Sequence, residues 1–273
     1  MRFLILLVTA LLVRFTPLRR GIHPDPARLW ATYSAALAQR RPGWAGVAML
    51  LLPLVPLELA FWLLNGVAHG FFVLLLGVFV LLLGLGGNDL LHSFGQRFEQ
   101  AWARGDKAAA AMVAENEMGL LAEDEVSLLA RVRGRMLTDA LRGYFVPVLW
   151  FLLLGPLGAL GYRLLRLFVE RLPADDRTYI TSLVHAMEWL PARLLAASFA
   201  LVGHFDQVFG ALRGLWGDWD SAIEPLLVTA AEAALSTSEQ PGEDETVLAP
   251  IRALLFRAML VWAVPVALLA LLG

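Results

Sequence analysis

Polar side chains that could take part in chemistry are concentrated in one short stretch, HAMEWLPAR, which begins at His185. His185 and Glu188 are three residues apart, a spacing that places two side chains on one face of a helix. Pro191 fits the first turn of a helix, so Arg193 is expected near the positive end of a new helix. A buried arginine needs an anionic partner. The stretch therefore predicts either a binding site for a carboxylate or phosphate group, or a structural ion pair of Arg193 with Glu188 or Glu58.

Three residues outside this stretch are further candidates for a ligand site. Glu58 lies inside an apolar segment, where an ionisable side chain is costly and is by default a functional candidate; the alternative is that it reaches the membrane surface. His92 follows Asp89 on one helical face, and this pair suits an anion-bearing ligand or an ordinary helix-start hydrogen bond. It is too small for a metal site. His204 is expected close to His185.

The composition excludes several classes of protein. The chain has 273 residues, of which 59% are hydrophobic and 17% charged, and its mean hydropathy is +0.66. A soluble domain carries about 25% charged residues, so these values indicate a membrane protein. The net charge of −2 gives no indication of a nucleic-acid partner. The chain lacks cysteine, which excludes disulfides and thiolate ligands. No P-loop, nucleophile elbow, dinucleotide glycine pattern or HExxH occurs, and neither a catalytic residue nor a cofactor is predicted.

Four apolar segments are long enough, or nearly so, to cross a bilayer. They are residues 43–64, 71–85, 144–169 and 254–272. Gly155-Pro156 interrupts the third segment, which favours a kinked span packed among other helices over a broken helix that lines a site. The expected fold is an all-α polytopic integral membrane protein with about 4–5 membrane helices and a cytoplasmic helical subdomain.

The expected organisation follows from these segments and from the polar stretches between them. The N-terminus reads as an uncleaved, short, interfacial helix, because its apolar run ends at Arg14. Helices are expected over residues 90–98, 108–118 and 123–141, with a break at Gly105-Asp106. The resulting divisions are 1–42, 43–87 (hairpin), 88–143 (cytoplasmic subdomain), 144–169 (broken span), 170–235 (membrane-associated region), 236–249 (acidic linker) and 250–273 (last span).

Basic residues set the expected orientation. Arg28 and Lys107 belong to two arginine-rich segments that flank the hairpin, whereas the link at its tip, residues 65–70, has no lysine or arginine. Both flanks are therefore expected in the cytoplasm. A single crossing by residues 144–169 would place Arg171 outside, against the same rule. Either the Gly155-Pro156 break makes a re-entrant hairpin, or residues 190–205 cross back.

Three motifs in this order resemble the AmpE family of inner-membrane proteins. They are RGYFVPVLW from Arg142, HAMEWLPARL from His185 and ALVGH from Ala200. The resemblance extends over almost the whole chain. It implies a bacterial inner-membrane protein that regulates β-lactamase induction through cell-wall-recycling signals. Its implied partners are the lipid bilayer and an anionic cell-wall-derived or phosphorylated ligand.

The chain is also similar to the CobD/CbiB family of membrane enzymes, which form an amide on a corrinoid. The shared frame includes PVLW from Pro147, GYR from Gly161 and PARL from Pro191. Most acidic groups that would bind Mg²⁺ and a nucleotide in those enzymes are replaced here. The retained basic residues are Arg142, Arg163, Arg166 and Arg193. These features favour a non-catalytic regulator that binds an anion at Arg193, His185, Glu188, His204, Arg142, Arg163, Glu58 and His92; a corrinoid-type synthase and a small transporter are the alternatives.

The charge distribution gives a topology prediction. A single cysteine at Asn65 or His69 should react with a membrane-impermeant maleimide in spheroplasts, because the uncharged tip faces the periplasm. Cysteines at Arg28 or Lys107 should react only after the membrane is opened. Reaction of position 69 only after permeabilisation would contradict this orientation.

Overall fold

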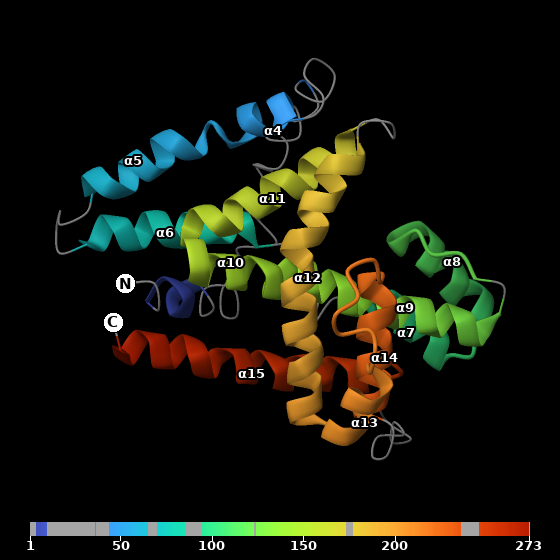
Figure 1. Ribbon diagram of the computed structural model, residues 1–273. Helices are drawn as coiled ribbons and strands as arrows, with labels where there is room; N and C mark the ends of the chain where they lie inside the picture. Colours follow the sequence, from blue (N-terminus) through green and yellow to red (C-terminus); the bar gives the residue numbers. More distant parts are fainter. Residues whose placement is uncertain are drawn as a thin grey trace. The chain divides into compact units, whose positions relative to one another are not determined.

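The chain folds into α-helices throughout the part that the computed structural model describes, which is residues 4–9, 36, 44–64, 70–85, 94–122, 124–172, 177–235 and 246–272 (Figure 1). The predicted all-α class is confirmed. The helices are α4 (Trp44–Leu51), α5 (Leu54–Leu64), α6 (Phe71–Gly84), α7 (Gln96–Ala103), α8 (Lys107–Met118), α9 (Glu125–Ala140), the π-helix η2 (Leu141–Phe145), α10 (Val146–Leu154), α11 (Pro156–Arg171), α12 (Arg177–Val202), α13 (Phe205–Ala211), α14 (Ile223–Leu235) and α15 (Ala249–Leu272).

The helices belong to two compact units. Unit 1 comprises Met1–Gly87, Gly143–Glu188 and Val266–Gly273, and unit 2 comprises Asn88–Arg142 and Trp189–Pro265. Three of the four boundaries between the units fall inside η2, α12 and α15, so single helices pass from one unit into the other.

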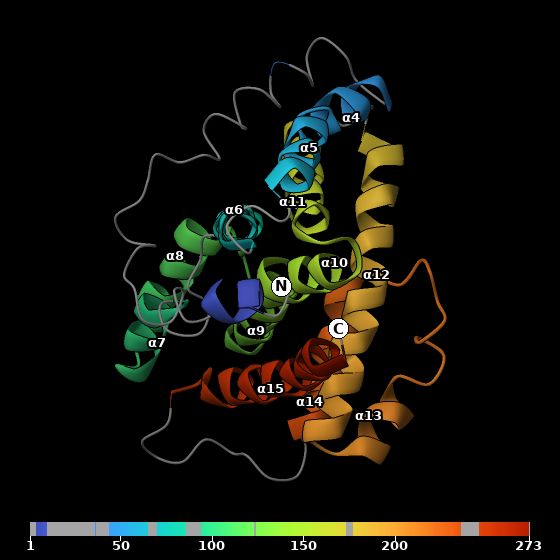
Figure 2. The same cartoon turned by 90° about the vertical axis from the view of Figure 1, so that its left-hand side faces the viewer.

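In unit 1, α11 is the central helix, and it packs against α4, α5, α6 and α10 (Figures 1 and 2). Small residues on α11 make these close contacts possible. A Cβ atom on Gly84 of α6 would lie 3.2 Å from the backbone of Ala159, and one on Gly161 would lie 3.5 Å from Leu54. Close helix packing through glycine and alanine is typical of helices in apolar surroundings.

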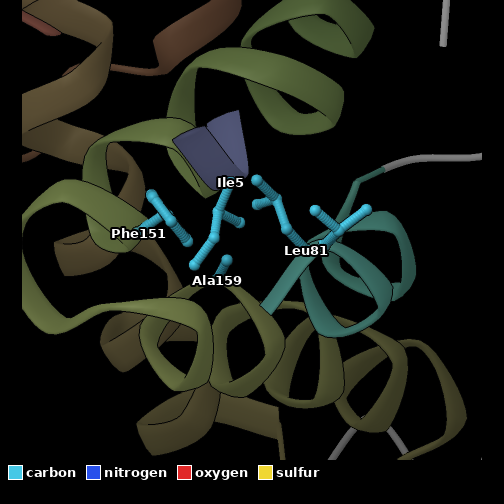
Figure 3. Close-up of a cluster of buried hydrophobic side chains, with 5 residues drawn as sticks. Ile5, Leu81, Phe151 and Ala159 are labelled. Carbon is cyan, nitrogen blue, oxygen red and sulfur yellow. The ribbon is translucent and has the colours of Figure 1, made fainter. Parts of the chain in front are cut away.

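The N-terminal helix, residues 4–9, is part of the core of unit 1. Ile5 is buried among Leu81 of α6, Phe151 of α10 and Ala159 of α11 (Figure 3). Its side chain fills the space beside Gly77, where an added Cβ atom would clash with it. This segment therefore shares a core with three other helices, and its expected position at the membrane interface stays a prediction.

The segment 144–169 is a hairpin of two helices, so the preferred prediction of a single kinked span is wrong. Gly155 ends α10 with φ 78° and ψ −166°, a combination that only glycine adopts readily. Pro156 then opens α11, where its missing N–H costs nothing. The two helices pack so closely that a Cβ atom on Gly158 would lie 2.5 Å from the carbonyl oxygen of Trp150. The reversal agrees with the hairpin alternative, and its re-entrant course in a membrane stays a prediction.

Unit 2 contains two of the three predicted helices of residues 88–143 in their expected places, as α8 and α9. The helix predicted over residues 90–98 differs: α7 begins only at Gln96 and continues to Ala103, and residues 90–93 lie outside the described residues. Asp106 follows Gly105, whose φ is 76°, and its carboxylate accepts from the backbone N–H of Ala109 at the start of α8. Asp124 caps α9 in the same way through Ser127. These hydrogen bonds from the backbone N–H and hydroxyl of Ser127 lower the pKa of Asp124 below its usual value.

A buried ion pair in unit 2 ties α7 to the start of α15. The Glu99 carboxylate lies 2.6 Å from Arg252 and accepts a second hydrogen bond from the same guanidinium at 3.0 Å. It also accepts from the backbone N–H of Leu248, 3.2 Å away. Glu99 thus compensates the charge of Arg252 and accepts from a backbone N–H at the start of α15. These three hydrogen bonds satisfy the buried Glu99 carboxylate without water.

Two helices in the described residues are long and apolar enough to cross a membrane, judged by length and composition alone. The first is Ala45–Leu64, which contains α5 and most of α4 and has a mean hydropathy of 2.2. The second is Glu125–Leu154, which consists of α9, η2 and α10 and has a mean hydropathy of 1.4. Phe71–Gly84 is a shorter apolar helix. The first two expected spans therefore correspond to apolar helices. The last expected span, residues 254–272, lies in α15.

The hairpin contact predicts the effect of one added methyl group. Gly158→Ala should destabilise the protein by about 1–3 kcal/mol, because the methyl group meets a backbone oxygen that cannot move without separating α10 from α11. Gly210→Ala in α13 is the matched control, since nothing lies within 4 Å of its added Cβ. Thermal unfolding in detergent measures both. Equal stability of the two variants would contradict the close hairpin contact.

Candidate functional site

The predicted site residues are divided between the two units. His185 and Glu188 lie on α12 in unit 1, whereas Arg193 lies five residues further along the same helix in unit 2. His204 directly precedes α13 in unit 2, so the structure does not group it with His185. The stretch HAMEWLPAR therefore contributes to two separate polar clusters, each of which has its own partners.

The helix continues through Pro191, so the predicted helix start at this residue is wrong. α12 is one helix from Arg177 to Val202. A proline inside a helix leaves the carbonyl four residues earlier without its donor, and here that carbonyl belongs to Met187. The indole Nε1 of Trp150 on α10 donates to this oxygen at 3.0 Å. Because the orphan carbonyl has a donor from another helix, Pro191 is tolerated, and Arg193 does not lie at a positive helix end.

The first cluster surrounds the buried carboxylate of Glu188. It accepts a hydrogen bond from the Tyr162 hydroxyl at 2.7 Å and one from the Arg166 guanidinium at 3.1 Å. Tyr162 and Arg166 are both on α11, so the cluster ties α11 to α12. Arg166 also lies 3.7 Å from Glu170 one turn later. The predicted ion pair between Glu188 and Arg193 is wrong, because Glu188 is paired with α11 instead.

Arg163 is on α11, three residues before Arg166, and is half-buried. Within the described residues, its guanidinium has neither a hydrogen bond nor an ion pair. His185 lies one helical turn before Glu188 on α12 and is also half-buried. The helix that supplies Tyr162 and Arg166 to Glu188 thus also carries a guanidinium without a described partner, that of Arg163, which belongs to the basic set expected from the sequence.

The second cluster surrounds Arg193, which is buried and holds the loop of residues 212–222 in place. Its Nε donates to the carbonyl of Trp216 at 3.0 Å, and its Nη2 donates to the carbonyl of Asp218 at 2.5 Å. The same nitrogen lies 3.1 Å from the Ser221 hydroxyl. The carbonyls of Leu215 and Trp189 complete the set at 3.4 and 3.3 Å.

Arg193 therefore has its donors occupied by the protein itself. Backbone carbonyls replace the carboxylate or phosphate partner that the sequence suggested, and the guanidinium plane stacks 4.0 Å from the Trp189 ring. Burial lowers the pKa of Arg193, and the charge of Asp218 opposes this shift. The geometry makes Arg193 a positioning residue for the loop, and it leaves little donor capacity for a ligand.

The remaining candidates have separate positions. Glu58 is exposed on α5 in unit 1, and Arg142 is half-buried in η2, in unit 2. η2 is the widened turn that admits Pro147, which cannot donate to the carbonyl four residues earlier. His92 lies outside the described residues. No group of three His, Asp or Glu side chains among the described residues is placed to hold a metal ion.

Three important residues were not singled out as site residues by the sequence. Tyr162 and Trp150 occur in the motifs GYR and PVLW without a role of their own, and Glu99 lies outside every motif. A tyrosine, a tryptophan or a glutamate in an apolar helix usually has a polar partner when buried, and this rule was the available signal. The partner of each one lies on a helix distant in sequence, so the pairs could not be assigned.

The Arg193 cluster predicts a structural defect on substitution. Arg193→Ala should destabilise the protein by about 2–4 kcal/mol and lower its abundance, because the carbonyls of Leu215, Trp216 and Asp218 lose a charged donor. Arg213→Ala, which removes an exposed arginine from the same loop, should have little effect. Unfolding followed by tryptophan fluorescence measures both. Normal stability of Arg193→Ala would contradict the positioning role.

Comparison with known proteins places the chain in a family. The family model described as regulatory signalling modulator protein AmpE matches residues 37–273. Protein AmpE of Shigella flexneri is 25% identical over 222 residues, which cover 77% of this chain and 78% of that protein. No solved structure matches the chain. The likeness to CobD/CbiB proteins stays a prediction. Since the family match spans most of the chain, including both clusters around α12, the chain belongs to the AmpE family of regulatory signalling modulator proteins.

Proposed function

We propose that this chain is a multi-pass protein of the bacterial inner membrane that regulates β-lactamase induction by binding an anionic ligand, without catalysis. The ligand is a cell-wall-derived or phosphorylated molecule. The family supports the regulatory part of this proposal, and the AmpE resemblance supplies the link to β-lactamase and cell-wall recycling. The membrane location and the ligand site are supported by separate features of the described helices.

The membrane location rests mainly on the helix Ala45–Leu64. It has 20 residues, which is the length needed to cross a hydrocarbon core of about 30 Å. Only 11% of the residues in its most apolar stretch are buried inside the structure. Trp62 and Val55 are 70% and 65% exposed. An apolar helix with this much exposed surface would aggregate in water, but it is stable in lipid.

The hairpin of α10 and α11 supports a re-entrant third segment. A chain that enters the membrane along α10 and reverses at Gly155 returns along α11 to the side from which it came. Arg142 before the hairpin and Arg171 after it are then on the same side, and that side is the cytoplasm. The conflict between the third segment and the distribution of basic residues disappears without a crossing by residues 190–205.

The ligand site is assigned to the surroundings of Glu188. Arg163 has donors that no described residue occupies, and Arg166 and Tyr162 are held in position by Glu188. An arginine presents a planar set of donors that fits a carboxylate or phosphate. Binding rather than catalysis is proposed because Glu188 is already engaged by two donors, and because the acidic groups that would bind Mg²⁺ in the similar enzymes are absent.

Membrane integration is tested by fractionation. The full chain should remain in the membrane pellet after extraction at alkaline pH and should be released only by detergent. Replacement of Leu59 and Leu63, both exposed on α5, by lysine should reduce membrane insertion, because each charge at membrane depth costs about 2.5–3.5 kcal/mol. Release of the unaltered chain by alkaline extraction would contradict the proposed location.

The ligand site is tested in a strain that lacks the native gene and reports β-lactamase induction. Arg163→Gln should remove the regulatory effect at normal abundance in the membrane, whereas Arg163→Lys should keep part of it because the positive charge remains. Arg171→Gln is the matched control, since it removes an exposed arginine at the end of the same helix. A normal phenotype of Arg163→Gln at normal abundance would contradict this site.

A further inference from the structure

Two arginines occupy neighbouring positions on one face of α11. Arg163 and Arg166 are three residues apart, a spacing that brings the Cβ atoms of two helical residues to about 5–6 Å from each other. Both residues are half-buried. Like charges at this spacing repel each other, and partial burial reduces the screening of that repulsion. The pair therefore needs acidic groups or an anion next to it.

The acidic groups of the protein compensate only one of the two arginines. Nη1 of Arg166 donates to Glu188 at 3.1 Å, and Nε of Arg166 lies 3.7 Å from Glu170, whose side chain is 53% exposed. Within the described residues, Arg163 has neither an ion pair nor a hydrogen bond, and Nη2 of Arg166 has no hydrogen bond. Donors from both guanidinium groups thus remain at neighbouring positions of one helix.

We propose that Arg163 and Arg166 together bind a phosphate group, with the donors of Arg163 and the Nη2 of Arg166 on its oxygens. This inference rests on the proposed function and deepens it, because it selects phosphate over carboxylate as the anionic group of the ligand and adds Arg166 to the ligand contacts. A carboxylate has two oxygens in one plane, and one guanidinium satisfies both of them. A phosphate monoester has three acceptor oxygens that point in different directions, so it can accept from two guanidinium groups at once.

Glu188 prepares Arg166 for this role. The buried Glu188 carboxylate is itself held by the Tyr162 hydroxyl at 2.7 Å, and it fixes Nη1 of Arg166. A guanidinium that is held at one nitrogen loses less side-chain freedom when another nitrogen binds a ligand. Glu188 also balances the charge of Arg166, which leaves the charge of Arg163 for the anion. Tyr162 and Glu188 are therefore positioning residues, and the two arginines are the ligand contacts.

Thermal unfolding with two added anions tests the choice of phosphate. The purified full chain is kept in a maltoside detergent without phosphate, and inorganic phosphate or acetate is added at equal ionic strength. An anion that binds only the folded state raises the unfolding temperature. Inorganic phosphate should do so at a concentration at least about tenfold lower than acetate, because it accepts from both arginines. Equal effects of the two anions, or no effect of phosphate, would overturn the proposal.

Substitutions of the two arginines locate the effect. Arg163→Gln should raise the phosphate concentration for half of the stabilisation about tenfold or more, because charge-assisted hydrogen bonds are lost. Arg166→Gln should act in the same way; if it fails to fold because Glu188 is left unpaired, Arg163→Gln decides alone. Arg171→Gln is again the matched control and should leave the response unchanged. An unchanged phosphate response of Arg163→Gln would overturn the proposal.

Vesicles distinguish a lipid headgroup from a soluble phosphate. The chain is reconstituted into phosphatidylcholine with and without phosphatidic acid, and each sample is titrated with inorganic phosphate. A weaker response in the presence of phosphatidic acid identifies a lipid phosphate at the site, whereas an unchanged response identifies a soluble one.

The regulatory phenotype separates this inference from the proposed function. Equal stabilisation by acetate and phosphate, together with a lost regulatory effect of Arg163→Gln, would reject the phosphate and leave the proposed function standing. Phosphate-specific stabilisation that Arg163→Gln abolishes, together with normal regulation by that variant, would support the phosphate site and contradict its regulatory role.

Discussion

The continuity of α12 depends on a donor for the backbone carbonyl group that Pro191 leaves unpaired. Trp150 illustrates the constraint, because its indole donates to the Met187 carbonyl that Pro191 deprives of a partner. The same residue's own carbonyl lies against Gly158, where the absence of a side chain lets α11 approach. Trp150 thus takes part in two features of the fold: its carbonyl lies at the hairpin contact with α11, and its indole supports the unbroken helix α12. Without the indole donor, a carbonyl would be buried unpaired at a cost of about 1–3 kcal/mol.

The two polar clusters around α12 solve the related problem of buried charge in different ways. Glu188 is compensated by a hydroxyl and a guanidinium from α11, which fixes α11 relative to the first part of α12. Arg193 is compensated by backbone carbonyls of a loop, which fixes that loop on the second part. The helix α11 of the first arrangement also carries Arg163, which has unused donors, whereas the second arrangement leaves almost none. This difference is why the ligand site is assigned to the Glu188 cluster.

The sequence was sufficient for features that depend on local chemistry. Asp106 and Asp124 start helices where a capping residue follows a break, and the long apolar segments form apolar helices. The sequence was insufficient where contacts with residues distant in the chain determine the local conformation. In a sequence, a proline at a helix start cannot be told from a proline inside a helix until the donor for the orphan carbonyl is known. Here that donor is Trp150, which lies 37 residues before Met187. Gly155-Pro156 also fits both a kink and a reversal, and packing of α10 on α11 selects the reversal.

The reversal of the chain at Gly155 is tested most directly by the distance between two spin labels. The labels are attached to cysteines that replace Val148 on α10 and Arg171 on α11, in the full chain reconstituted in lipid. Pulsed electron–electron double resonance measures the distance between them. In an uninterrupted helix these two positions would be about 35 Å apart. The hairpin predicts a single distance well below that value. A distribution centred near about 35 Å would contradict the reversal and the re-entrant segment built on it.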